Sequence, residues 1–468
     1  MSTQLIVILG YFAIVTVVGL LASRLASSSD DFLLAGRKMG VFICSAAIAG
    51  EWIGGTSTIG TAEGGFLYGI SAAWFAVANA LGTVILAFTL AKLYRRSSAF
   101  TVTGFMEQYF GVRCRIVSSV VLTFVMIVVA SVQIVAGAAL MHTLTGINML
   151  AAVWLTGAVF LVYTLSGGLW AIGYTNVLHV IVMYVGLILG LGMISSRMGG
   201  TETLSLNLPA YPYMSLAGAG ISNVIAWITA SVFAALVAQA AVQPIMGARD
   251  ENVAQKSALL AAIYITPVGI IAALLGMYAR VAYPGIASRT ALPVLMMSLP
   301  PWAGGVVLAG VLAAILSTVA PCILAAGTLL SKDVYQRLIC PAATDDKVRA
   351  VSRWFTLACG IIAIIWGLYC KVILDQVYFA YTLRATIAIL LLFGVYWKNT
   401  RPKSAVFALA LTTIFALGWE MAKNLLGRYP YGIHPMYVAL VTTCVVVIAG
   451  SLVGRELGRA RGHAGGEG

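Results

Sequence analysis

The sequence is poor in charge. Charged residues make up 9% of its 468 residues and hydrophobic residues 61%, whereas about 25% of residues are charged in an average soluble protein. So few charges cannot give a soluble fold a polar surface. The composition therefore excludes a water-soluble globular protein and indicates an integral membrane protein.

Motifs for catalysis and nucleotide binding are also missing. The sequence contains no glycine-rich phosphate loop, no HExxH and no GxSxG, which are the patterns of ATP sites, zinc hydrolases and serine hydrolases. The seven cysteines have no disulfide or metal-ligand spacing, and most lie in apolar runs as small core residues do. We therefore expect no enzyme activity, and any uphill transport must draw on an ion gradient.

Apolar runs long enough to cross a bilayer fill the chain. A transmembrane helix needs about 20 apolar residues, and 13 such runs predict an all-α polytopic protein with a single membrane domain over residues 1–468. The runs occupy residues 4–22, 41–69, 71–93, 117–144, 149–167, 174–196, 218–242, 258–280, 302–329, 352–370, 375–397, 404–425 and 435–453.

The positive charge predicts an orientation. The net charge is +13, but the basic residues gather in alternate connections, which is the bias of cytoplasmic loops and not a nucleic-acid surface. Only six of the 28 lysines and arginines fall on the other side, namely Arg197, Arg280, Arg289, Lys371, Lys423 and Arg428. We predict that the N-terminus lies outside and the C-terminus inside.

The second run is unusual for a membrane span. Residues 41–70 contain seven glycines and two carboxylates, Glu51 and Glu63. Glycine costs about 1 kcal/mol relative to alanine in a helix interior, and a charge at membrane depth costs roughly 2.5–3.5 kcal/mol. Irregular backbone persists in a membrane only where protein buries it or it lines a watery cavity. This run therefore predicts a broken helix on a transport path.

Arg384 is a second charge inside the membrane, in the eleventh run. At 1.5 Å per residue, Glu51 and Arg384 lie about 15–20 Å from the cytoplasmic ends of their spans, near the midplane of the bilayer. Three interpretations are open. The two residues form a structural ion pair, Arg384 binds a substrate carboxylate, or Glu51 carries a proton or contacts a substrate amine.

Two further polar features lie inside apolar runs. Ser317 and Thr318 are adjacent hydroxyls among small residues. They can present oxygens to a hard cation such as Na+, or bond back to the preceding helical turn. His179 in the sixth run is either a buried, hydrogen-bonded histidine or a proton relay.

Five segments together resemble the sodium/solute symporter family. They are DFLLAGRKMG, the glycine-rich second run, TLSGGLWAIGYTNVLHVIVMYVGL, VQPIMGARDENVAQKSALLAA and AAILSTVAPCILAAGTLLSKDVY. The resemblance implies the leucine-transporter fold, with two inverted five-helix repeats whose first helices are discontinuous. The repeats would cover residues 41–196 (spans 2–6) and 218–397 (spans 7–11). Residues 1–30 would hold a peripheral first span, and residues 404–453 two peripheral last spans.

The resemblance also implies positions for the binding sites. The residues implied to hold a Na+ coupling ion are Ser317 and Thr318 through their hydroxyls and Ala314, Cys44 and Ala47 through their carbonyls. The residues implied to bind the solute are Ile48, Glu51 and Trp52, with Arg384 on the opposite wall.

The chain departs from the family pattern in two places. Ala46 stands where an acid or amide is common, and Asn176-Val-Leu-His179 stands where the family usually has Asp-x-x-Gln. The loss of negative charge would weaken Na+ binding or let protons contribute to coupling. The candidates for such a role are Glu51, Asn176 and His179.

The sequence thus predicts a sodium-coupled secondary active symporter that imports a small polar organic solute, carboxylate or amino-acid-like, by alternating access. Two alternatives are a proton-coupled symporter that uses Glu51 or His179, and a solute-sensing membrane domain with little transport. The expected partners are the solute and the lipid bilayer, without nucleic acid or an obligate protein partner. Compact loops and family habit predict a bacterial inner (plasma) membrane.

Overall fold

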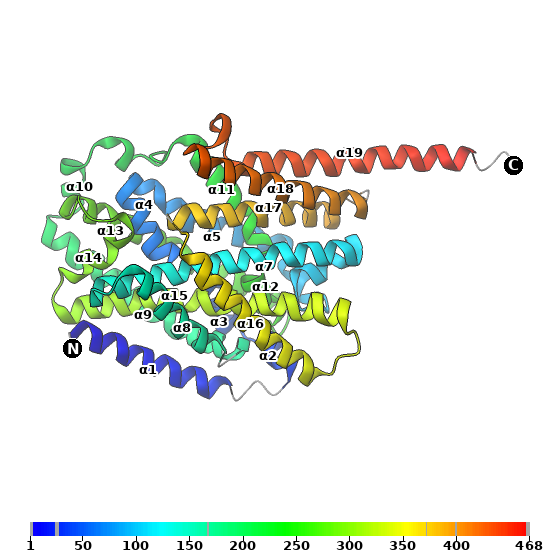
Figure 1. Ribbon diagram of the computed structural model, residues 1–468. Coiled ribbons are helices and arrows are strands. Elements are labelled where there is room, and N and C mark those ends of the chain that lie inside the picture. Colours follow the sequence, from blue (N-terminus) through cyan, green and yellow to red (C-terminus); the bar gives the residue numbers. More distant parts are fainter. Residues whose placement is uncertain (1–2, 24–27, 166–167, 371, 398–399, 465–468) are drawn as a thin grey trace.

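The chain folds into a bundle in which most long helices run side by side (Figure 1). The computed structural model describes residues 3–23, 28–165, 168–370, 372–397 and 400–464. Within these ranges the extended pairing is one isolated bridge between Met39 and Ala248. Ten helices in the described chain are long and apolar enough to cross a membrane. An all-helical membrane protein is therefore confirmed, whereas the count of 13 spans and the orientation stay predictions.

The helices fall into long elements that overlap the predicted spans and short elements that connect them. The long elements and the halves of broken spans are α1 (Thr3–Ser23), α3 (Val41–Trp52), α4 (Thr61–Tyr68), α5 (Trp74–Thr89), α7 (Val102–Thr145), α8 (Met149–Leu165), α9 (Gly168–Met198), α11 (Ile221–Leu236), α12 (Gln239–Met246), α13 (Glu251–Ala282), α15 (Pro301–Thr328), α16 (Asp345–Gly367), α17 (Ile373–Tyr396), α18 (Pro402–Leu426) and α19 (Pro435–Ala464). The short α-helices are α2 (Ser29–Leu34), α6 (Ala91–Arg96), α10 (Glu202–Asn207) and α14 (Ala291–Met297). The 3-10 and π-helical turns are η1 (Ala35–Arg37), η2 (Thr56–Gly60), η3 (Gly69–Ala73), η4 (Ala210–Met214), η5 (Ser288–Thr290), η6 (Leu329–Ile339) and η7 (Pro430–Gly432).

Several helices are longer than their apolar runs. Hydropathy marks only the part of a helix that matches the bilayer, whereas the helix itself extends from its N-terminal cap to its C-terminal cap. The element α7 joins two helical stretches at Gly111, which is non-helical (φ 75°, ψ 178°), and the first stretch begins after Thr101, whose hydroxyl accepts a bond from the Gly104 N–H at 2.9 Å. Asp250 caps α13 in the same way, accepting from the Val253 N–H at 2.9 Å.

The second span is broken, as its glycines predict. The helix α3 ends at Trp52, Ile53 leaves the helical conformation, and the chain becomes helical again at η2 and α4. Close packing explains the glycines at the break. A Cβ on Gly54 would lie 2.3 Å from the Thr318 hydroxyl oxygen, and one on Gly55 would lie 2.5 Å from the Ala136 side chain.

The seventh span is broken as well, between α11 and α12, where Ala238 is extended. Both breaks are joined to α7 by a glutamine. At the first break, the Gln133 side-chain oxygen accepts from the Gly55 N–H at 2.6 Å and its amide donates to Thr56 Oγ1 at 3.0 Å. At the second, the Gln239 side-chain oxygen accepts from the Val102 N–H at 2.8 Å. Side chains thus pair backbone N–H groups that lack helical partners.

The start of α3 is joined to the end of α12. The Met39 N–H donates to the Gly247 carbonyl at 3.1 Å, and the Arg249 N–H donates to the Met39 carbonyl at 3.0 Å. The Arg95 guanidinium adds bonds to the carbonyls of Ala248 and Arg249. The two broken spans are therefore closed against each other at this end of the bundle, which we call the α3–α12 junction.

The packing of α13 against the first broken span leads to a prediction. A Cβ on Gly276 of α13 would lie 2.0 Å from the Ala62 carbonyl oxygen of α4. We expect Gly276→Ala to separate the two helices and to lower stability by about 1–3 kcal/mol, as overpacking does. A lower apparent unfolding temperature would show it. The control is Gly192→Ala in α9, where a Cβ meets no atom within 4 Å; equal unfolding temperatures for the two variants would contradict the packing.

Candidate functional site

Two hydroxyls of α15 lie against the free end of α3. The Ser317 hydroxyl oxygen is 2.7 Å from the Ala314 carbonyl, 3.0 Å from the Ile53 carbonyl and 3.4 Å from the Gly50 carbonyl. The Thr318 hydroxyl oxygen is 2.5 Å from the Gly50 carbonyl. Five oxygens thus meet, but the two hydroxyls supply only two protons. A surplus of oxygen acceptors is what a hard cation needs. We call these atoms the oxygen cluster.

The oxygen cluster differs in part from the set that the family resemblance implied. Ser317, Thr318 and Ala314 come together, but the α3 carbonyls beside them belong to Gly50 and Ile53, not to Cys44 and Ala47. Cys44 instead donates its thiol proton to the Pro244 carbonyl of α12 at 3.3 Å. Cys44 precedes Gly50 by six residues, or about 9 Å of helix. The carbonyls of Cys44 and Ala47 therefore stay a prediction, whereas those of Gly50 and Ile53 are the ones that contact the two hydroxyls here.

Asn176 of α9 borders the oxygen cluster. Its side-chain nitrogen lies 3.4 Å from the Ser317 carbonyl, and a Cβ on Gly50 would lie 2.1 Å from that nitrogen. Asn176 therefore supplies a neutral donor at this position and no negative charge. His179, one turn further along α9, bonds through Nδ1 to the Tyr11 hydroxyl of α1. The structure thus places Asn176 beside the cluster and turns His179 toward a peripheral helix.

Glu51 and Arg384 meet in a buried ion pair. The Arg384 Nη2 lies 3.0 Å from Glu51 Oε1, and both side chains are 0% exposed. The second carboxylate oxygen, Oε2, accepts from the Cys322 thiol at 3.1 Å. The Arg384 guanidinium carbon lies 5.1 Å from the Tyr381 ring centre and 5.9 Å from that of Trp52. Three of the four residues expected to bind solute therefore adjoin, and the fourth, Ile48, is buried one turn before them on α3.

The ion pair leaves donors unused. Among the described residues, Arg384 Nε and Nη1 and Trp52 Nε1 have no hydrogen-bond partner. A buried donor without a partner costs about 1–3 kcal/mol, more when it is charged. The remaining contact of Arg384 Nη2 is a weak one to the Met126 sulfur at 3.9 Å. A carboxylate brought to this site would accept from one of the unpaired guanidinium nitrogens, Nε or Nη1.

Glu63, the second carboxylate of the broken span, has a structural role. Its Oε2 accepts from the Ile373 N–H at the start of α17, and its Oε1 accepts from the Ser288 hydroxyl, both at 3.1 Å. A carboxylate at a helix N-terminus pairs free N–H groups and complements the helix dipole. Glu63 therefore anchors α4 to the beginning of α17.

Comparison with known proteins identifies the family to which this chain belongs. Residues 32–411 match the model of the sodium:solute symporter family. The chain belongs to that family. It is 26% identical to the sodium/glucose cotransporter of Vibrio parahaemolyticus, over 93% of this chain and 88% of that protein. It is 24% identical to the sodium/proline symporter of Salmonella typhimurium, over 86% of this chain and 85% of that protein.

A solved structure shows the same fold. A Na+-coupled sialic acid symporter in a substrate-bound, outward-open state matches this chain with a TM-score of 0.81 and 17% identity, over 97% of both chains. Family and fold confirm that this protein is a Na+-coupled symporter in a membrane. Na+ is therefore its coupling ion, and its relatives are transporters rather than enzymes.

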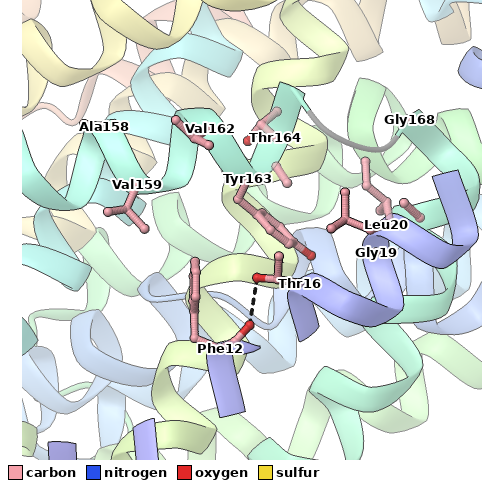
Figure 2. A pocket seen from close by; sticks show the side chains of 13 residues that line it. Phe12, Thr16, Gly19, Leu20, Ala158, Val159, Val162, Tyr163, Thr164 and Gly168 are labelled. Atoms are coloured by element: carbon pink, nitrogen blue, oxygen red, sulfur yellow. Dashed lines mark hydrogen bonds between the residues drawn. The ribbon is translucent and has the colours of Figure 1, made fainter. Parts of the chain in front are cut away.

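A large cavity of the symporter has no residue of the ion pair or of the oxygen cluster in its wall. It has a volume of about 390 Å³ and lies among α1, α8 and α9, with Ala320 of α15 in its wall (Figure 2). Its lining is mostly apolar, and the dashed bond in Figure 2 runs from the Thr16 hydroxyl to the Phe12 carbonyl at 2.8 Å. Leu20 and Val162 in its wall are 50% and 70% exposed. An apolar cavity beside lipid-facing side chains does not suit a polar solute.

Gln133 of α7 bonds to the break of the second span, and this contact leads to a prediction. In Gln133→Leu, the Gly55 N–H at the break keeps no side-chain acceptor, a loss of about 1–3 kcal/mol. We expect a lower apparent unfolding temperature and a smaller stabilisation by Na+, since Gly55 follows the carbonyls of the oxygen cluster. Wild-type values for Gln133→Leu would show that the glutamine does not hold the break.

Proposed function

We propose that this symporter imports a small polar organic solute with a carboxylate group, and that Na+ binds at the oxygen cluster. One observation carries the ion site: five oxygens from the end of α3 and from α15 share two hydroxyl protons. Helix breaks that free backbone carbonyls are a general way of coordinating Na+ in transporters. The site needs no carboxylate, so the neutral Asn176 nearby is compatible with it.

Na+ at this position couples to transport by joining two helices. An ion shifts a conformational equilibrium only through different affinities for the two states. The oxygen cluster combines carbonyls of α3 with hydroxyls of α15, so movement of one helix against the other separates the ligands. Na+ therefore favours the state in which the cluster is assembled, and its release accompanies the opposite state of an alternating-access cycle.

The solute binds at the buried ion pair. Arg384 has two unpaired nitrogens, Nε and Nη1, and each can donate to a carboxylate oxygen of the solute. Glu51 provides a place for an amine. The relatives are named for glucose and for proline, and of these two solutes only proline has both charged groups. An amino-acid-like solute is the class that this pair favours.

We also propose an arrangement of the chain in the membrane, as the distribution of basic residues and the family resemblance predict it. The N-terminus lies outside and the C-terminus inside, in a bacterial inner membrane, with 13 spans. Residues 41–196 and 218–397 form the two inverted repeats, and residues 1–30 and 404–453 are peripheral. The α3–α12 junction then lies on the cytoplasmic side, and its backbone bonds must break for solute to leave inward.

Thermal stability of the purified symporter tests this function. Unfolding is followed in NaCl and in KCl at equal ionic strength, with L-proline, glycine betaine, succinate, D-glucose or uracil. A ligand that binds only the folded state raises stability by mass action. We expect a Na+-specific rise that one carboxylate solute enlarges. A solute effect that follows pH and ignores Na+ would support proton coupling through Glu51 or His179 instead.

A further inference from the structure

A second ion pair lies at the start of α17, about 14 Å along the helix from Arg384. A cavity of about 190 Å³ is bordered there by Asp375 and Lys423. Four aromatic side chains share the wall, and they are Tyr68, Trp227, Tyr378 and Tyr429. Asp375 and Lys423 are 37% and 23% exposed, so a ligand can reach both. The cavity therefore offers charges of both signs and aromatic surface in one place, and we call it the α17–α18 cavity.

Lys423 shows which group this cavity can hold. Its ammonium nitrogen lies 3.2 Å from Asp375 Oδ2, 3.2 Å from the Tyr429 hydroxyl and 4.6 Å from the centre of the Tyr429 ring. A carboxylate and an aromatic ring are the usual partners of an alkylammonium. The Lys423 side chain thus occupies a position that an incoming ammonium group would also find favourable.

His434 adds no charge to the cavity. It is 3% exposed, and burial, followed by the nearby Lys423 ammonium, lowers the pKa of His434 to about 4. Its Nδ1 accepts from the Met436 N–H at 3.2 Å, which also requires that nitrogen to be unprotonated. The charged groups at the cavity are therefore Asp375 and Lys423, with the Glu420 carboxylate 3.8 Å from the Lys423 ammonium.

Aromatic rings connect the α17–α18 cavity to the buried ion pair. Trp227 stacks on Tyr378 with ring centres 4.9 Å apart, and the Tyr378 and Tyr381 centres are 6.4 Å apart. Tyr381 in turn lies 5.1 Å from the Arg384 guanidinium. On α17 these residues recur at intervals of three from Asp375, and Asp375 and Arg384 are separated by about 14 Å of helix. One helix therefore carries both charged sites and the rings between them.

We propose that the α17–α18 cavity is a loading site for a zwitterionic solute, one with an alkylammonium and a carboxylate, on its way to the Glu51–Arg384 pair. The inference rests on the proposed function, in which the solute binds at that pair. The solute ammonium binds Asp375 and the aromatic wall, and its carboxylate binds Lys423. When a zwitterion binds, the ion pair between Asp375 and Lys423 is replaced by two new ion pairs, one between the solute ammonium and Asp375 and one between the solute carboxylate and Lys423. A sugar offers no such exchange, and a simple anion leaves Asp375 without a cation.

Protection of a cysteine placed in the cavity tests the proposal. Asn223 lines it on the exposed start of α11, and Asn223→Cys is labelled in right-side-out vesicles with a membrane-impermeant sulfonate thiosulfonate, against the wild-type protein as background. We expect L-proline or glycine betaine to slow labelling roughly threefold or more, as occupancy requires. D-Glucose and succinate should not. The added change Asp375→Asn should abolish the protection.

Two outcomes would overturn the loading site: no protection by either zwitterion, or equal protection by D-glucose or succinate. A second readout separates this failure from failure of the proposed function. The Na+-induced rise in unfolding temperature, measured without solute, depends on the oxygen cluster and not on this cavity. It should survive in Asp375→Asn, while zwitterion protection should survive in Ser317→Ala/Thr318→Ala. Loss of the Na+ effect in wild type would refute the ion site and leave the protection result valid.

Discussion

Replacing Ser317 and Thr318 together by alanine should raise the Na+ concentration for half-maximal uptake at least about tenfold, equivalent to about 1.4 kcal/mol or more of lost binding energy. The double variant removes two of the five oxygens that meet between α3 and α15. The remaining carbonyls cannot surround the ion. The measurement is uptake of the transported solute as a function of Na+, together with equilibrium binding of radioactive Na+ to purified protein.

The same helix provides a matched control. Thr328 is fully buried on α15, but its hydroxyl bonds back to the Leu324 carbonyl at 2.8 Å, so Thr328→Ala removes a buried hydroxyl without touching the oxygen cluster. Its Na+ dependence should equal that of wild type. An unchanged Na+ dependence in the Ser317/Thr318 variant would refute the ion site, whereas an equal change in Thr328→Ala would show that the effect is one of general destabilisation.

Arg384→Met should abolish solute uptake and strongly destabilise the protein. The substitution leaves Glu51 as a buried carboxylate without its cation, since both side chains are 0% exposed. Removing one partner of such a pair typically costs 3–5 kcal/mol. Apparent unfolding temperature and initial uptake rate measure the two effects. For comparison, Arg96→Met breaks the exposed pair with Glu251, and exposed pairs are worth about 0–1 kcal/mol.

The double variant Glu51→Gln/Arg384→Met separates a structural pair from a binding site. It removes both charges, so it should recover much of the lost stability. If Arg384 receives the solute carboxylate, uptake remains absent although the protein is stable. If the pair only joins α3 and α17, uptake returns with stability, and that result would refute the solute site. Arg384→Lys should keep the charge but raise KM, because lysine lacks the planar fork.

Much of the fold could be predicted from the sequence because the membrane constrains it. Long apolar runs must be helical in lipid, and the glycines between Gly50 and Gly65 indicated a broken helix that is present. The rise per helical residue placed Glu51 and Arg384 at a similar depth in the bilayer, and the two side chains form an ion pair. These features depend on local composition and helix rise, which the sequence contains directly.

Which α3 carbonyls contact the hydroxyls of α15 depends on where α3 ends. That point is fixed by tertiary packing, with Gly54 against Thr318 and Gln133 bonded to Gly55. No local pattern distinguishes a free carbonyl at Gly50 from a paired one at Ala47. The glycine pair directly after Ile53 is the sequence signal that lies nearest to the end of α3.

The α17–α18 cavity was beyond sequence reasoning for a related reason. Charge counting placed Lys423 on the outer side, but nothing in the chain linked it to Asp375, which lies 48 residues earlier on another span. The pairing exists because α17 and α18 pack together, with the turn that contains Tyr429 folded over their ends. Contacts between spans depend on how the helices pack, and the hydropathy of the sequence does not determine that packing.

The central claim is that a Na+ gradient drives solute uptake through the oxygen cluster. The most direct test is uptake by proteoliposomes of the solute that stabilises the protein most, with an inward gradient of Na+, of K+ or of protons. We expect accumulation with the Na+ gradient, none with K+, and none with a proton gradient in Na+-free buffer. Accumulation driven by protons without Na+ would contradict it.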